Sequence, residues 1–111
     1  NPFLLHAKVG SFLAKEKYGI QDQEILDAIA CHTTGKPGMG MLDKILYIAD
    51  YIEPCRNQAP DLAVVRRLAF EDLDQCLYRI LKDTLEYLEA SRMECDILTQ
   101  QTYEYYRECL I

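Results

Sequence analysis

The chain has 111 residues, enough for one domain with one hydrophobic core and too few for two ordinary domains. Half of its residues are apolar and 27% are charged, which excludes an intrinsically disordered chain. The formal net charge of -6 disfavours non-specific binding to nucleic acid or to an anionic membrane, so a phosphate-bearing ligand must meet local positive charge.

The first half of the chain is expected to form three helices. Residues 1–18 begin with an Asn-Pro pair, which suits a helix start, and a glycine follows them. Asp22 opens a second helix, which the Gly- and Pro-containing loop of residues 33–38 ends. Residues 41–53 form a third helix that is apolar over much of its circumference. We therefore expect this third helix to be central.

The second half is also expected to be helical. Residues 55–61 read as a polar loop, and residues 62–89 form either one long helix or two helices with a bend near Phe70. A final short helix starts after Thr99. Strand-like alternation is absent over any useful length, so the sequence predicts an all-α fold in a single domain over residues 1–111.

Two histidines and one aspartate stand on apolar helical faces. His6 directly follows two leucines, and His32 is in phase with the inner side of the second helix. Asp50 places a carboxylate on the apolar stripe of the third helix, where an unpaired buried charge is costly. Each histidine alone is also explained as a hydrogen-bonded core residue. Together the three offer nitrogen and oxygen donors suited to iron, manganese or zinc, and we expect them to converge on one pocket.

The loop after His32 has the composition of a phosphate-binding segment. Thr33, Thr34 and Lys36 offer hydroxyl and ammonium donors, and Gly35 lets a ligand approach the backbone. Arg56 lies just past the third helix and can clamp a phosphate with two hydrogen bonds. A Gly/Pro-rich turn without function has the same composition, and a loop arginine is more often simply solvated. We expect Lys36 and Arg56 to border the same pocket as the three candidate metal ligands.

The cysteines and the hydropathy pattern indicate a reducing, non-membrane location. The five cysteines are widely spaced and include no C-x-x-C pair, which argues against a disulfide framework or a cysteine zinc site. Apolar runs fall short of the roughly twenty residues that span a bilayer, and the N-terminus has no signal-like segment. We expect a soluble, cytoplasmic protein with unpaired thiols.

Three strings in the sequence resemble those of one known family. They are LLHAKVG at residues 4–10, HTTGKPGM at residues 32–39 and ADYIEPCR at residues 49–56. Their order and spacing, together with RLAFEDLD at residues 67–74, resemble the YqeK-type HD-superfamily phosphohydrolases. The resemblance covers nearly the whole chain.

This resemblance implies an HD-domain helical bundle that cuts diadenosine tetraphosphate into two ADP molecules. Two divalent metals, typically iron, with manganese or zinc as alternatives, activate a shared water in that family. Asp50 resembles the carboxylate that closes the first metal's shell, and His6 and His32 resemble imidazole ligands of the second. The implied polyphosphate-binding residues are Thr33, Thr34, Gly35, Lys36 and Arg56.

The chain departs from the family pattern at its start. The family's early histidine and its adjacent His-Asp pair have no counterpart, because the sequence contains no His-Asp dipeptide. We therefore expect a partial HD domain that lacks its N-terminal helices, is inactive by itself and exposes an apolar face that favours a homodimer. The alternatives are an HD-domain hydrolase of another nucleotide and a non-catalytic helical binding module.

Overall fold

The computed structural model describes residues 2–53 and 61–110, with side chains from residue 5 onward. The described residues contain no strand, which confirms the all-α fold. The helices are α1 (Pro2–Glu16), α2 (Gln23–Cys31), α3 (Met41–Tyr51), α4 (Leu62–Ala69), α5 (Leu73–Ala90) and α6 (Ile97–Cys109).

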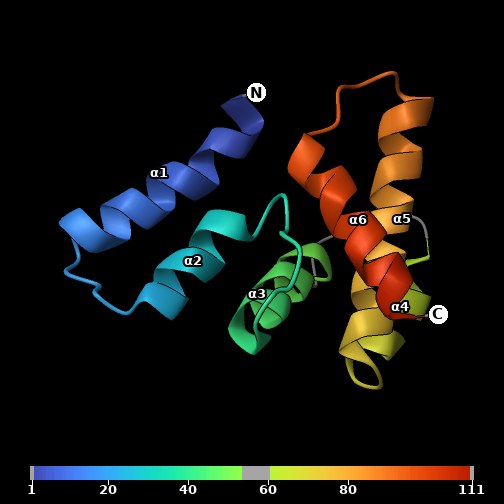
Figure 1. The fold of residues 1–111 in the computed structure, drawn as a ribbon, viewed down its shortest axis with the longest axis horizontal. Helices are drawn as coiled ribbons and strands as arrows, with labels where there is room; N and C mark the ends of the chain where they lie inside the picture. The colour runs from blue at the N-terminus through green and yellow to red at the C-terminus, as the bar shows by residue number, and fades with distance from the viewer. Residues whose placement is uncertain (1, 54–60, 111) are drawn as a thin grey trace.

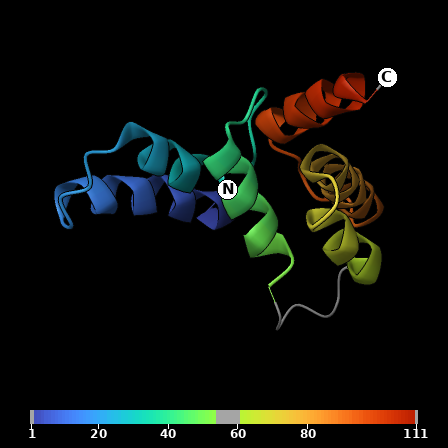
Figure 2. The ribbon, with the colours of Figure 1, turned by 90° about the horizontal axis from the view of Figure 1, so that it is seen from below.

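The helices form two groups with α3 between them. Helices α1 and α2 lie side by side as an antiparallel pair, and α4, α5 and α6 pack together at the other end of the molecule (Figure 1). The view from below shows α3 between the two groups (Figure 2). Helix α3 contacts α2 on one side and α5 on the other, so the expectation of a central third helix is confirmed.

The main hydrophobic core lies among α3, α4, α5 and α6. Helix α5 contributes more of its buried side chains than any other helix, with four of zero exposure. The buried members of this core are Met39, Tyr47, Ile48, Val65, Cys76, Leu77, Ile80, Leu81 and Tyr106. A second region of packing joins α1 to α2, where Ala7 and Ala28 are both 1% exposed and allow the two helices to approach closely.

Helix ends follow the local capping signals. The Asp22 carboxylate accepts a hydrogen bond from the Glu24 amide, as expected for the start of the second helix. The open choice for residues 62–89 resolves as two helices, because the Asp72 carboxylate caps α5 after a break at Phe70. The last helix begins at Ile97, earlier than expected, since Asp96 caps it. The Asn1 start and the loop of residues 55–60 lie outside the described residues.

The apolar face of the first helix is not buried. Leu5, Phe12 and Leu13 are exposed, as is Ile45 on α3. The helical period places apolar side chains on one face of a helix, but in the described part of the chain no other element covers these faces. The described part of the chain contains no helix both long enough and apolar enough to cross a bilayer.

The segment that joins α2 to α3 docks onto α6. The Met39 amide donates a hydrogen bond of 2.9 Å to the Tyr106 hydroxyl. The Thr99 hydroxyl donates one of 3.1 Å to the Thr34 carbonyl. Both contacts are buried, and burial raises the pKa of Tyr106 to about 12, so its hydroxyl remains neutral. These hydrogen bonds fix the segment against the C-terminal group of helices.

We expect Tyr106→Phe to lower the free energy of unfolding by about 1–2 kcal/mol, because it leaves the buried Met39 amide without its acceptor. Urea denaturation of the native protein measures the change. Tyr105→Phe is the matched control, since Tyr105 is exposed and its ring is retained. Equal stabilities of the two variants would contradict the anchoring role of Tyr106.

Candidate functional site

The structure brings the two histidines together. His6 lies on α1 and His32 directly follows α2, and their rings meet edge to face with centroids 5.2 Å apart. Two imidazoles that bind one metal ion at about 2.1 Å hold their ring centroids roughly 5 Å apart. The pair is therefore spaced as two ligands of a single ion would be.

The surroundings of His32 fit a metal ligand. Its Nδ1 lies 2.6 Å from the Ile29 carbonyl oxygen. A carbonyl can only accept a hydrogen bond, so Nδ1 carries a proton and Nε2 is the ring nitrogen left to coordinate a metal. Metal-binding histidines usually have this arrangement, in which a backbone carbonyl fixes the ring and its tautomer.

The three candidate ligands are less buried than their positions on apolar helix faces predict. His6 and Asp50 are exposed, and His32 is half-buried. The cause is that their helix faces are not covered by the described residues, as the exposure of Leu5 and Ile45 shows. Within residues 2–53 and 61–110 no three His, Cys, Asp or Glu side chains group closely enough to hold a metal. A shared site for Asp50 and the histidines remains a prediction.

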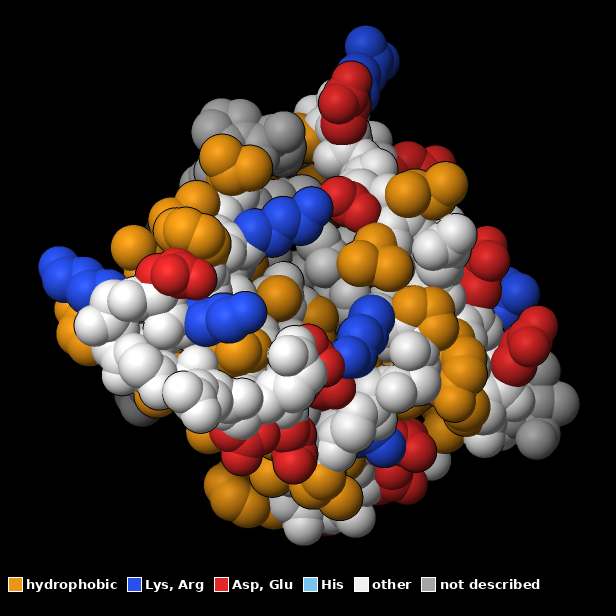
Figure 3. Space-filling view, turned by 60° about the vertical axis from the view of Figure 1, so that its left-hand side comes forward, with side chains coloured by type: hydrophobic (Ala, Val, Ile, Leu, Met, Phe, Trp, Pro, Cys, Tyr) orange, Lys and Arg blue, Asp and Glu red, His pale blue; other side chains and the backbone are white. Residues whose placement is uncertain are grey.

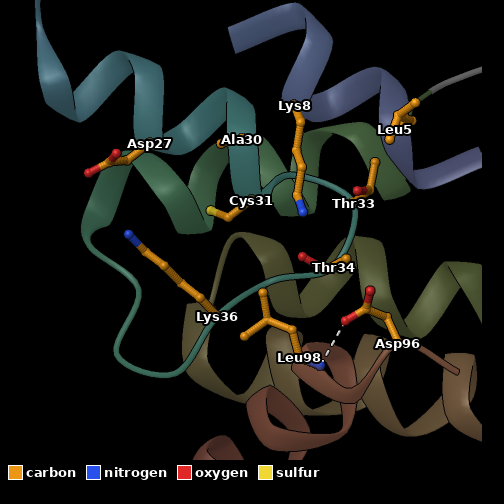
Figure 4. Close-up of a pocket in the computed structure, with 10 residues that line it drawn as sticks. All are labelled: Leu5, Lys8, Asp27, Ala30, Cys31, Thr33, Thr34, Lys36, Asp96 and Leu98. Atoms are coloured by element: carbon orange, nitrogen blue, oxygen red, sulfur yellow. Dashed lines mark hydrogen bonds between the residues drawn. The ribbon is translucent and has the colours of Figure 1, made fainter. Parts of the chain in front are cut away.

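A pocket lies beside the histidines. It has a volume of about 400 Å³ and is bounded by α1, the end of α2, the following loop and the start of α6 (Figure 4). Thr33, Thr34 and Lys36 of the expected phosphate-binding loop line it. Its other lining residues are Leu5, Lys8, Asp27, Ala30, Cys31, Asp96 and Leu98. Arg56 lies outside the described residues.

Gly35 has a packing role. Its φ is 76°, and an added Cβ would lie 2.9 Å from Thr102 Cγ2 on α6. The loop therefore needs glycine here to approach α6, which is a reason other than the close approach of a ligand. Gly35 is absent from the pocket lining, whereas its neighbours on both sides belong to it.

Lys36 is held by a buried carboxylate. Its Nζ lies 3.5 Å from Asp43 Oδ2, and the same oxygen accepts a 2.9 Å hydrogen bond from the Gly40 amide. Asp43 is 5% exposed and sits in the first turn of α3. This one carboxylate thus ties the loop, its lysine and the start of α3 together.

Cys31 forms an uncharged part of the pocket wall. Burial and, to a smaller extent, the nearby Asp43 carboxylate raise the pKa of its thiol to about 11. The thiol is therefore protonated at neutral pH and is a poor nucleophile. Its side chain acts here as a small apolar surface.

The sequence analysis did not identify two residues that the structure places at the site. Lys8 points into the pocket from α1 (Figure 4), although it reads as an ordinary surface lysine. Its spacing of three residues from Leu5, which also lines the pocket, is the signal that places both on one face. Asp43 is marked in the sequence only by its position three residues after Gly40, the spacing of a capping box.

The sequence is similar to those of curated bacterial proteins. The chain is 51% identical over 89 residues to the symmetrical bis(5'-nucleosyl)-tetraphosphatase of Bacillus subtilis, covering 79% of this chain and 47% of that protein. The protein of the same name from Halalkalibacterium halodurans is 45% identical over 85 residues, covering 77% of this chain and 45% of that protein. No protein-family model matches the chain. The chain spans about half the length of the curated relatives it matches.

One solved structure is similar over nearly the whole chain. It is an HD superfamily hydrolase from Clostridium acetobutylicum, described as involved in NAD metabolism. The two share 38% sequence identity with a TM-score of 0.93, covering 98% of this chain and 57% of the other. This similarity confirms the expected HD-domain helical fold.

We expect Gly35→Ala to destabilise the protein more than Gly19→Ala, by about 1–3 kcal/mol, because only Gly35 adds an overpacking contact to its positive φ. Gly19 has a φ of 69° with nothing within 4 Å of an added Cβ, so it isolates the backbone cost. Thr102→Ser should recover part of the difference, since it removes Cγ2 and keeps the hydroxyl that bonds the Leu98 carbonyl. Denaturant midpoints provide the measurement, and equal losses for the two glycine variants would refute the close contact.

Proposed function

We propose that this chain, a homologue of the symmetrical bis(5'-nucleosyl)-tetraphosphatases with the fold of an HD superfamily hydrolase, serves the symmetrical hydrolysis of dinucleoside tetraphosphates. Within that activity, residues 1–111 form one partial HD domain that contributes metal ligands and a phosphate-binding loop. The observation that carries the proposal is the His6–His32 pair next to the loop pocket.

His6 and His32 act as metal ligands in this proposal, and Asp50 completes the set from α3. The Ile29 carbonyl holds the His32 ring so that Nε2 presents its lone pair. A bound divalent metal supplies an activated water for attack at phosphorus and stabilises charge on the phosphoryl oxygens. Iron is the metal we propose, with manganese and zinc as alternatives, because imidazole and carboxylate donors suit all three.

The loop after His32 positions the polyphosphate. Thr33 and Lys36 line the pocket that begins beside the histidine pair, and Asp43 fixes the position of the Lys36 ammonium. An ammonium and hydroxyl donors stabilise phosphoryl oxygens as negative charge develops on them. Arg56 is proposed as a further phosphate contact from the loop after α3.

The alternative is hydrolysis of another nucleotide by the same residues. The solved HD hydrolase is described as involved in NAD metabolism, and a fold with its metal ligands does not determine the substrate. A panel of nucleotides offered to the native protein distinguishes the two. Release of ADP as sole product from diadenosine tetraphosphate supports symmetrical cleavage, whereas ATP with AMP would contradict it.

We expect His6→Ala and His32→Ala each to lower kcat/KM of the native protein for diadenosine tetraphosphate by about 100-fold or more, since loss of a metal ligand costs at least as much as loss of its outer partner. Bound metal per chain, measured by elemental analysis, should fall in parallel. Glu16→Gln is the control on α1, because Glu16 is exposed and belongs to neither the pair nor the pocket. Full activity in both histidine variants would refute the metal-ligand assignment.

We expect the 111-residue polypeptide, expressed by itself, neither to hold two metal ions nor to release ADP from diadenosine tetraphosphate. Three candidate ligands divided between two ions are too few, because three protein ligands on one ion is the usual minimum for a catalytic site. The Bacillus subtilis relative is the positive control in the same assay. Turnover by the 111 residues at a rate comparable with that relative would mean that other residues supply the ligands.

A further inference from the structure

The carboxyl end of α3 is held by an arginine from another helix. Arg66 of α4 donates from Nε to the Ile52 carbonyl at 3.3 Å and from Nη2 to the Glu53 carbonyl at 3.0 Å. Carbonyls at the end of a helix lack partners within the helix, and a cation beside them interacts favourably with the helix dipole. One guanidinium therefore fastens two successive carbonyls at the end of α3.

The helix that carries Arg66 is itself fixed on α5. Val65, which directly precedes Arg66, has zero exposure in the hydrophobic core. Arg79 of α5 forms ion pairs with Asp61, which directly precedes α4, and with the buried Asp83. Helix α4 has only eight residues, but it is attached to α5 at its start and at its middle. Arg66 thus joins the end of α3 to a fixed part of the C-terminal group of helices.

The adjacent Arg67 shows the ordinary arrangement of a surface arginine. Arg67 is exposed, and its Nε lies 4.0 Å from Glu71 Oε1 one turn along the same helix. Figure 3 shows a face on which Lys and Arg side chains stand singly, several of them next to Asp or Glu. Such exposed pairs contribute little to stability. Arg66 differs because it is half-buried and its acceptors are backbone carbonyls.

The backbone that Arg66 holds is that of Asp50. Asp50 stands two residues before Ile52 in the last turn of α3, about 3 Å away along the helix axis at a rise of about 1.5 Å per residue. Asp50 is exposed, so packing of its own side chain contributes little to its position. Helix ends fray when they are not held, and a metal ligand must stay within roughly 0.5 Å of its productive position. The contacts of Arg66 therefore bear directly on where the Asp50 carboxylate lies.

We propose that Arg66 is a positioning residue for Asp50, acting through the two carbonyls at the end of α3. The inference rests on the proposed function, because it takes Asp50 as a metal ligand. Nε and Nη2 belong to one planar group and reach two acceptors together, which a lysine ammonium on a flexible stem does not reproduce. Arg66 thus acts by geometry, and its positive charge alone is insufficient.

The test compares Arg66→Gln and Arg66→Lys with Arg67→Gln in the native protein. Arg67→Gln is the matched control, because it removes the same charge from the next position of the same helix. The rate at which the metal-loaded protein releases metal to a chelator measures how firmly the metal is held, and melting temperatures verify that each variant folds. Asp50→Asn, alone and combined with Arg66→Gln, completes a double-mutant cycle.

For Arg66→Gln and Arg66→Lys we expect metal release about tenfold faster than in the unaltered protein, the lower end of the effect of removing a group that orients a metal ligand. The kcat/KM for diadenosine tetraphosphate should fall by a similar factor. Arg67→Gln should match the unaltered protein in both measurements. In the Asp50→Asn background, Arg66→Gln should cause no further acceleration, because the ligand that it positions is already absent.

Equal release rates in Arg66→Gln and Arg67→Gln overturn the proposal. An undiminished effect of Arg66→Gln in the Asp50→Asn background also overturns it, since Arg66 would then act by general loosening of the fold. Unaltered metal release in Arg66→Lys shows that charge suffices and refutes the role of the two carbonyl contacts. Unaltered metal release in Asp50→Asn refutes instead the ligand role of Asp50 in the proposed function.

Discussion

The docking of the segment between α2 and α3 onto α6 is the constraint on which the candidate site depends. Two buried hydrogen bonds, from the Met39 amide to Tyr106 and from Thr99 to the Thr34 carbonyl, hold the segment in place. Gly35 has no Cβ, and this allows the segment to come close to Thr102 on α6. Because His32 and Thr33 stand at the start of this segment, the same contacts determine where the imidazole and the pocket hydroxyl lie. This docking adds to the packing of α2 on α3 and of α3 on α5, which also positions the α1–α2 pair relative to the C-terminal helices.

Local features of the fold were predictable from the sequence, whereas this docking was not. A carboxylate such as Asp22 or Asp72 caps its helix through an amide two or three residues away, so the signal and the partner lie in the same short window. Tyr106 and Met39 are 67 positions apart in the chain. A single hydrogen bond from a loop amide to a tyrosine hydroxyl produces no periodic pattern in the sequence. The prediction of residues 33–38 as a loop was therefore correct, but its attachment to α6 came only from the structure.

The candidate site was also predictable only in part. Phase along the helices and the family resemblance selected His6 and His32, and the structure places their rings in contact. Helical period indicates which residues share a face, but it does not indicate what covers that face, which is why the expected burial of His6 and Asp50 was wrong. Lys8 could not be distinguished from any exposed lysine by sequence, because its role depends on a cavity formed by segments from both halves of the chain.

The charge distribution limits where this acidic chain could offer a site to a phosphate-bearing ligand. With a net charge of -6, the protein as a whole repels polyanions, so attraction must arise from a few local groups. At the pocket, Asp43 pairs with Lys36, and Asp27 and Asp96 add negative charge, whereas Lys8 forms no ion pair within the described ranges. One ammonium is insufficient to retain a polyanion by charge alone in physiological salt. Any selectivity of this pocket must therefore also come from its apolar walls and its hydrogen-bonding groups.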